Sequence, residues 1–264
     1  LGSVVGQKAM ALAVQKAKTC GIGSVIVRGS THYGSSAVHA DVALKENCIG
    51  VAMTNAGPEM AAWGGATAVV GTNPWALAAP TGLGFDVSLD IALTTAGKGM
   101  MRWLEREGKP MPRDWALTPE GEETDDPSTA MMGALLGIGH YKGYGLSFMT
   151  DVLTGVLSGG AFGLTPYANP AKQDVAHSFI ALDIAWFMPL NDFKQRMAAF
   201  IANVKKSKLR PGFQEILVPG ELEQRRELER RQQGVLLDAS VFDELAALAK
   251  KLELDFPFKR EVLA

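Results

Sequence analysis

Apolar and polar positions follow helical and strand-like spacing in turn along the first part of the chain. Residues 4–19 carry apolar side chains at helical spacing, and Gly21 then offers a stop before the strand-like SVIV at 24–27. The turn RGSTHYGSS follows at 28–36, then a second helical stretch, and IGVAMTN at 49–55 is again strand-like. Because helices and strands alternate, the pattern predicts a layered α/β domain rather than an all-β one.

Further along, two segments have the character of strands and one that of a helix. FDVSLDIA at 85–92 alternates apolar and polar side chains, and SFIALDIAWF at 178–187 has the apolar character of a buried strand. The segment after Asn191 has helical spacing. Its predicted inward face consists of Phe193, Met197, Phe200, Ile201 and Val204.

The segment GLSFMTDVLTGVLSGG at 145–160 predicts a mostly apolar helix with one polar stripe. The stripe consists of Ser147, Asp151, Thr154 and Ser158, at spacings of four, three and four residues. A ligand cleft or a contact between subunits would each use such a stripe, and the sequence does not choose between them.

Composition and charge narrow the possible partners. The 264 residues suffice for one or two domains, and the formal net charge of −2, without a basic block, argues against nucleic acid or an anionic membrane as partner. No apolar run reaches the ~20 residues of a membrane span. Cys20 and Cys48 form no CxxC pair, which favours a reducing cytoplasm over a disulfide framework.

Several common motifs are absent from the sequence. The glycine fingerprint GxGxxG is missing, and its near matches at 21–26 and 137–142 lack the third glycine, so a Rossmann dinucleotide turn is not supported. P-loop, HExxH and GxSxG motifs are missing as well. None of the four histidines forms an HxH or HxxxH pair, so no metal site is predicted.

His32 is the residue best placed for proton transfer. It follows a predicted buried strand, between Gly29 and Gly34 and among small hydroxyl residues, where a substrate would have room. Imidazole titrates near neutrality and can give a proton to an alkoxide or take it back. The alternative is that His32 only caps its turn by hydrogen bonding.

Three further positions are candidates for ligand binding. Lys142 lies in a glycine-rich turn before the apolar helix, where an ammonium and the positive end of a helix would suit a phosphate or carboxylate, although a solvated lysine fits equally. Asp90 lies on the polar face of its strand and would accept hydrogen bonds either from ribose or from a loop that it caps. The turn VPGE at 218–221 could bring backbone close to a ligand.

In their order along the chain, the following blocks resemble those of the type-2 malate/L-lactate dehydrogenase family. They are RGSTHYGSSAVHA, AMTNAGPEMAAWGG, GTNPWALAAP, SLDIA, HYKGYGLSFMTDVLTGVLSGG, SFIALDI and PGELEQRR. The family also includes ureidoglycolate, L-sulfolactate and diketogulonate oxidoreductases and reductases of cyclic imino acids. The resemblance extends over nearly the whole chain.

The resemblance implies a layered α/β/α fold with a mixed sheet and without the Rossmann topology. It also implies a homodimer that uses NAD or NADP to transfer hydride to or from a small 2-oxo or 2-hydroxy acid, with His32 as the acid/base. The positions that match cofactor contacts are Ala56, Asp90, Ile91, Ala92, Tyr141, Lys142, Pro219, Gly220 and Glu221.

The chain also departs from the family pattern. SLDIALTT stands where DMATS is commoner, and a Ser-His-Gly block with a carboxylate-binding arginine finds no match. Residues 1–264 are therefore expected to hold most of the cofactor-binding and catalytic region, with a helical substrate-binding segment upstream. A cyclic imino-acid reductase and a catalytically silent dinucleotide-binding module are the alternative interpretations.

Overall fold

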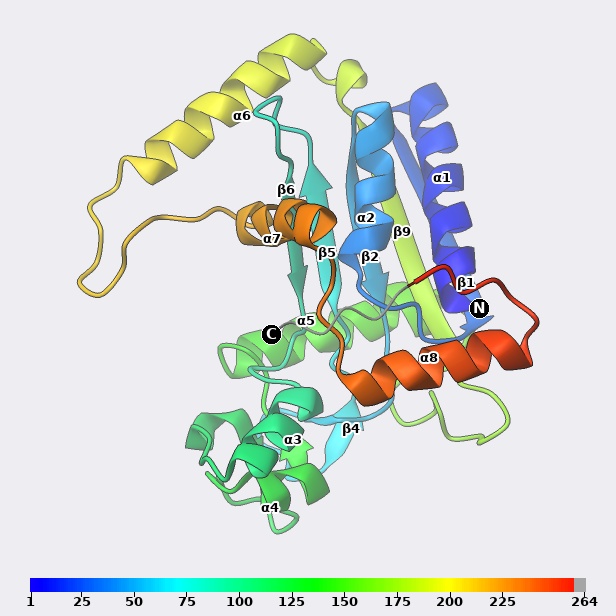
Figure 1. Ribbon diagram of the computed structural model, residues 1–264, viewed down its shortest axis with the longest axis vertical. Coiled ribbons are helices and arrows are strands. Elements are labelled where there is room, and N and C mark those ends of the chain that lie inside the picture. Colours follow the sequence, from blue (N-terminus) through cyan, green and yellow to red (C-terminus); the bar gives the residue numbers. More distant parts are fainter. Residues whose placement is uncertain (259–264) are drawn as a thin grey trace. The chain divides into compact units, whose positions relative to one another are not determined.

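The computed structural model describes residues 1–258 (Figure 1). The chain folds into two compact units, Leu1–Glu221 and Leu222–Ala264. The first unit contains both sheets and every residue proposed above for a site.

The larger sheet has five strands in the order β1-β9-β2-β5-β6, and every neighbouring pair is antiparallel. The strands are β1 (Ile22–Ser30), β2 (Cys48–Thr54), β5 (Trp75–Ala79), β6 (Val87–Ile91) and β9 (Val175–Asp183). The strand predictions at 24–27, 49–55, 85–92 and 178–187 are thus confirmed, with shifted ends. The last strand ends at Asp183, because its carboxylate accepts a hydrogen bond from the Ala185 N–H and caps the 3₁₀ turn η4 (Ile184–Trp186).

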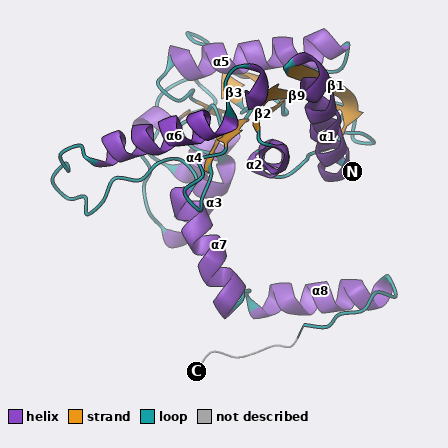
Figure 2. Cartoon of the chain, turned by 90° about the horizontal axis from the view of Figure 1, so that it is seen from above, coloured by secondary structure: helices purple, strands orange, loops and turns teal. Residues whose placement is uncertain are grey.

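Helices cover both faces of this sheet. On one face lie α1 (Gly2–Cys20), α2 (Ala37–Ala40) and the 3₁₀ helix η1 (Asp41–Glu46); α5 (Tyr141–Asp151), continued by the π-helical turn η3 (Val152–Val156), lies on the other (Figure 2). The core between sheet and α1 is rich in alanine. Close packing there requires glycine, since a Cβ on Gly23 would lie 1.9 Å from the Ala13 carbonyl oxygen. The predicted layered α/β/α class is confirmed.

The mixed character predicted for the sheet belongs to a smaller, second sheet in the order β4-β3-β8-β7. Its strands are β3 (Met60–Ala61), β4 (Ala68–Val70), β7 (Ala116–Leu117) and β8 (Ala134–Leu135), and only β3 and β8 run parallel. The 3₁₀ helix η2 (Arg113–Trp115), α3 (Lys98–Glu107) and α4 (Pro127–Met132) belong to the same part of the chain. Met101, Leu104 and Leu135 are among the residues of its own small core.

The helix predicted after Asn191 is α6 (Leu190–Lys205), but its inward face is only partly correct. Ile201 is buried and Phe193, Met197 and Val204 are partly buried, whereas Phe200 is 63% exposed. Within residues 1–258, only part of the apolar stripe finds protein to pack against, so helical spacing overstated its burial.

The second unit contains most of α7 (Glu221–Gln233) and all of α8 (Ala239–Lys251). Arg231 and Glu227 form an i,i+4 ion pair of 2.6 Å on α7, as its balanced charge allows. Of the helices within residues 1–258, none combines the length and apolar character that a bilayer crossing requires.

Candidate active site

Three of the predicted site segments contact the edge strand β6 or the chain just beyond it, and Asp90 joins the His32 loop to the strand. Asp90 Oδ2 accepts hydrogen bonds from Ser35 Oγ at 2.5 Å and from the Ala37 N–H at 2.9 Å. The loop-capping role that the sequence left open for Asp90 is therefore present. It fixes residues 35–37, only a few residues beyond His32, beside the strand that carries Asp90, Ile91 and, just after its end, Ala92.

A late loop packs against the same strand. The Ser88 N–H donates to the Pro219 carbonyl oxygen at 3.1 Å, and Gly220 has a φ of +86°. A Cβ on Gly220 would lie 2.8 Å from the Ser88 nitrogen, so glycine permits this approach. Glu221 is buried, and both its carboxylate oxygens lie 2.6 Å from Lys205 Nζ. In the free protein that carboxylate stabilises the loop.

The turn before α5 reaches the chain just beyond β6. The Ile138 N–H donates to the Leu93 carbonyl oxygen at 2.9 Å. The N–H groups of Lys142 and Gly143 donate to carbonyl oxygens inside the turn, so these two amides are not free to bind an anion. The exposed ammonium of Lys142 and the positive helix end remain, and Tyr141 beside it is 58% exposed.

A cavity of about 740 Å³ adjoins this turn. Its lining includes Gly137, His140 and Tyr144, together with the segment 61–66 and Arg113. A space of this size accommodates a small molecule. The turn that carries Lys142 therefore borders a ligand-sized cavity.

Ala56 lies in a loop held by a buried side chain. Its N–H donates to Asn73 Oδ1 at 2.9 Å, and Asn73 is fully buried. The amide of Ala56 is thus engaged inside the protein.

His32 is exposed, and its loop is anchored on the backbone side. The His32 N–H donates to Gln173 Oε1 at 2.5 Å, and the Gly34 N–H donates to His32 Nδ1 at 3.2 Å. The second bond requires a lone pair on Nδ1, so a neutral ring carries its hydrogen on Nε2.

Lys98 was not among the residues that the sequence pattern singled out. It starts α3, whose N-terminus has no side-chain cap, and its Nζ lies 4.0 Å from Glu59 Oε1 with the side chain only 25% exposed. A Cβ at Gly97 or Gly99 would meet nothing within 4 Å, so the backbone around the lysine is open. The only signal in the sequence was the GKG triplet shortly after the β6 segment.

A buried aromatic stack under the His32 loop was also missed. The Tyr33 ring stacks between His39 and His177, with centroid distances of 4.4 and 4.5 Å. His177 Nδ1 lies 2.7 Å from Thr54 Oγ1 and its Nε2 lies 2.9 Å from Ser30 Oγ. Burial lowers the pKa of His177 to about 4, and it also lowers that of His39. Both histidines are therefore neutral parts of the scaffold.

Fold and site together define an α/β protein of non-Rossmann architecture, in which the His32 loop, the late loop at Pro219–Gly220 and the turn before Lys142 each contact the edge strand β6 or the chain just beyond it. The family model described as malate/L-lactate dehydrogenase matches residues 1–246. The chain belongs to the malate/L-lactate dehydrogenase family and is an oxidoreductase of that family.

Named relatives and solved structures agree with this assignment. Malate dehydrogenase of Pyrococcus abyssi is 39% identical over 95% of this chain and 72% of the relative. L-sulfolactate dehydrogenase of Methanothermobacter thermautotrophicus is 34% identical over 98% of this chain and 74% of the relative. The crystal structure of malate dehydrogenase from Entamoeba histolytica superposes with a TM-score of 0.91 at 30% identity, covering 97% of this chain and 76% of that one.

More distant relatives have other names. They are (2R)-3-sulfolactate dehydrogenase (NADP(+)) of Chromohalobacter salexigens, Delta(1)-pyrroline-2-carboxylate reductase of Ancylobacter novellus and ureidoglycolate dehydrogenase (NAD(+)) of Escherichia coli O157:H7. These are 29–31% identical over 89–90% of this chain and 67–70% of each relative.

Proposed function

We propose that this protein transfers hydride between NAD or NADP and a small 2-oxo or 2-hydroxy acid, with His32 as the acid/base. The observation that carries the proposal is the meeting of three segments at β6: the His32 loop through Asp90, the late loop at Pro219–Gly220, and the turn before Lys142 through Leu93. Relatives named malate and L-sulfolactate dehydrogenase support the substrate class.

The residues present suit a dinucleotide. The exposed ammonium of Lys142, at the start of α5, would hold a phosphate. Gly220 lets the late loop pack closely against β6, because it has no Cβ. Asp90, Ile91 and Ala92, together with Ala56 and Tyr141, would border the rest of the cofactor. When bound, the reduced nicotinamide ring supplies the hydride.

The Gly34 hydrogen bond bears on how His32 would move a proton. A ring that donates a proton from Nε2 and ends neutral must start as imidazolium, with hydrogens on both nitrogens. The Gly34 N–H must then turn away from Nδ1. Gly34 has the freedom to do so, because its φ is +84° and a Cβ there would meet nothing within 4 Å.

Lys98 is the group we propose for the substrate carboxylate. An ammonium at an uncapped helix N-terminus attracts an anion twice over, through its charge and through the helix dipole. Its contact with Glu59 is loose at 4.0 Å, and a carboxylate would replace it readily. Glu59 follows the Ala56 loop closely in sequence, and its contact with Lys98 supports a role for the lysine beside that loop.

We expect Lys98→Ala to raise the KM for the 2-oxo acid by roughly ten- to a hundredfold, since a hydrogen bond to a charged group contributes about 1.5–3 kcal/mol. Dinucleotide affinity should change little. Lys142→Ala is the matched control, and it should show the reverse: weaker dinucleotide binding with the substrate KM nearly unchanged. Equal effects of both variants on both ligands would contradict the two assigned roles.

The proposed function is tested by a substrate panel with NADH and NADPH. The panel contains pyruvate, oxaloacetate, sulfopyruvate, diketogulonate and pyrroline carboxylate for reduction, and ureidoglycolate for oxidation. Turnover of 2-oxo acids supports the proposal. Turnover of the cyclic imine alone would make the protein an imino-acid reductase, and tight dinucleotide binding without any turnover would make it a silent module.

A further inference from the structure

The polar stripe of α5 faces the interior of the protein. Ser147, Asp151 and Thr154 are all buried, and Ser147 Oγ donates to the Gly71 carbonyl oxygen at 2.8 Å. Thr154 Oγ1 donates back to the Thr150 carbonyl oxygen. Ser158, the fourth member of the predicted stripe, is half-buried. The three buried members form neither a cleft wall nor a surface between subunits, and a carboxylate placed among them needs an explanation within the fold.

Asp151 holds two loops through one side chain. Its Oδ1 accepts a hydrogen bond from Asn55 Nδ2 at 3.1 Å, and its Oδ2 accepts one from Asn73 Nδ2 at 3.2 Å. Asn55 comes directly after β2, and Asn73 comes shortly before β5. All three side chains are at least 95% buried. The carboxylate thus joins two chain segments at the same end of the sheet.

Each asparagine side chain also forms hydrogen bonds with backbone groups. Asn73 Oδ1 accepts the Ala56 N–H at 2.9 Å, while its Nδ2 also donates to the Ser147 carbonyl oxygen. Asn55 Oδ1 accepts the Ala176 N–H at 2.8 Å, while its Nδ2 also donates to the Ala161 carbonyl oxygen. With both ends of each amide in use, neither side chain can flip without losing bonds.

The backbone is shaped around these side chains. Asn73 has a φ of +36°, in the left-handed region. A Cβ on Gly71 would lie 2.3 Å from Asn73 Oδ1, and a Cβ on Gly155, in the π-helical turn, would lie 2.9 Å from Asn55 Nδ2. Turns of this π type are frequent at functional sites.

We propose that Asp151 is a positioning residue, which acts through Asn55 and Asn73 to hold the Ala56 loop in the orientation that receives the dinucleotide. The inference rests on the proposed function, because that function assigns Ala56 to the cofactor. Its core is a chain of hydrogen bonds that runs from the Asp151 carboxylate through the Asn73 amide to the Ala56 N–H.

The substitution Asp151→Asn tests this chain with almost no change in volume. An asparagine offers one acceptor and one NH₂ group, so an NH₂ group would face the NH₂ of Asn55 or of Asn73. If Asn73 flips to relieve the clash, it loses the Ala56 N–H and the Ser147 carbonyl oxygen together. The Ala56 loop is then no longer fixed.

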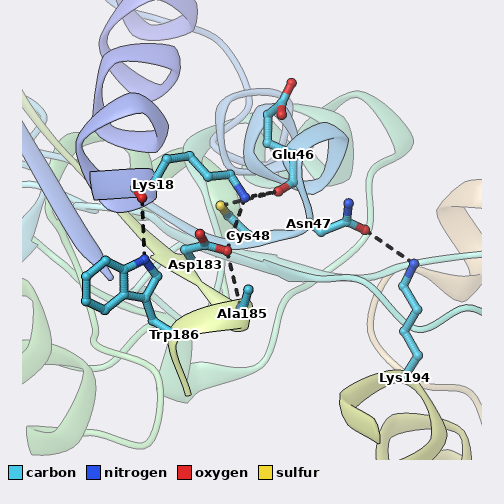
Figure 3. Close-up of polar contacts among 8 residues, drawn as sticks. All are labelled: Lys18, Glu46, Asn47, Cys48, Asp183, Ala185, Trp186 and Lys194. Atoms are coloured by element: carbon cyan, nitrogen blue, oxygen red, sulfur yellow. Dashed lines mark hydrogen bonds and ion pairs between the residues drawn. The ribbon is translucent and has the colours of Figure 1, made fainter. Parts of the chain in front are cut away.

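Asp183 provides the matched control. Like Asp151 it is 5% exposed, and it lies on β9 beside Cys48, at the other end of β2 from Asn55. It accepts hydrogen bonds from Lys18 Nζ at 3.1 Å and from the Ala185 N–H at 3.3 Å (Figure 3). Asp183→Asn therefore removes the charge of a buried carboxylate at the opposite end of β2 from the Ala56 loop.

Three measurements on the full chain separate positioning from stability: urea unfolding, hydrogen exchange of the free protein over residues 54–58, and titration with NADH and NADPH. For Asp151→Asn we expect about tenfold faster exchange in that segment and about tenfold weaker dinucleotide binding, the effect of one lost buried hydrogen bond. The substrate KM at saturating dinucleotide should change less than the dinucleotide Kd. For Asp183→Asn we expect lower stability, with exchange at 54–58 and dinucleotide binding as in the wild type.

Asn73→Ala breaks the same chain of hydrogen bonds, and it is the test variant if Asp151→Asn does not fold. In the double variant with both Asp151→Asn and Asn73→Ala, the loss of dinucleotide affinity should not exceed that of Asn73→Ala alone, since Asp151 acts through Asn73. Wild-type exchange at 54–58 in the folded single variants would overturn the inference. If the wild-type protein binds no dinucleotide but the variants still exchange faster at 54–58, the proposed function is wrong. The role of the hydrogen-bond chain in holding the loop would then still stand.

Discussion

Turnover by His32→Ala is expected to fall ~10²–10⁴-fold, the usual contribution of a positioned acid/base. The dinucleotide Kd should stay within about twofold, because a group that acts on the reacting oxygen contributes to the transition state rather than to cofactor binding. The loop itself should survive the change. Ser35 and Ala37 still bind Asp90, and the His32 position is anchored through its own N–H to Gln173. Steady-state kinetics with a direct cofactor titration measure both quantities.

His32→Gln is the control for a merely structural histidine. A glutamine can accept the Gly34 hydrogen bond that Nδ1 now accepts, but it cannot exchange a proton in this pH range. If His32 only caps its turn, the glutamine variant should keep most of the activity. If His32 transfers the proton, both variants should be equally slow. Full turnover by His32→Ala would pass the role to another residue.

Local patterns predicted the strands well but not their neighbours. β2 and β6 lie within a residue or two of the predicted segments, because alternation of apolar and polar side chains is a property of the strand itself. That β9 lies between β1 and β2 was not predictable. His177 pairs with Val27 on one side and with Thr54 on the other, and nothing in a short segment encodes contacts between such distant parts of the chain.

The same limit applies to the site. His32, Lys142 and the 218–221 turn carry local signals, a histidine or lysine among glycines and a Pro-Gly pair, and each lies in a segment that reaches β6 or the chain just beyond it. Asn55 and Asn73 carry no local signal of their role, because their partner Asp151 is 96 and 78 residues away. The period of α5 predicted which side chains share its stripe, yet a stripe buried against sheet loops has the same spacing as one that lines a cleft.

Stability should fall steeply in mild acid, and His177 is the main reason. Burial, and next the neighbouring His39, lower its pKa from 6.5 to about 4 in the folded protein. The unfolded chain binds the proton more readily, so acid favours unfolding. Above pH 6.5 His177 is neutral in both states and costs no stability; its destabilising effect grows as the pH falls from 6.5 towards 4 and stays constant below that. The shift corresponds to about 3 kcal/mol.

Urea unfolding between pH 7.5 and 4 measures this loss, which should lower the midpoint by about 1 M. His177→Gln is the decisive comparison, because glutamine can still bond to Ser30 and Thr54 but does not titrate. Its stability should vary much less between pH 6.5 and 5, where few carboxylates titrate. We attribute the pH dependence of stability that remains to His39, because burial also lowers the pKa of this residue. An unchanged slope in His177→Gln would mean that His177 is not what couples proton binding to folding, and that the neutral stack below the His32 loop does not set the acid limit of the fold.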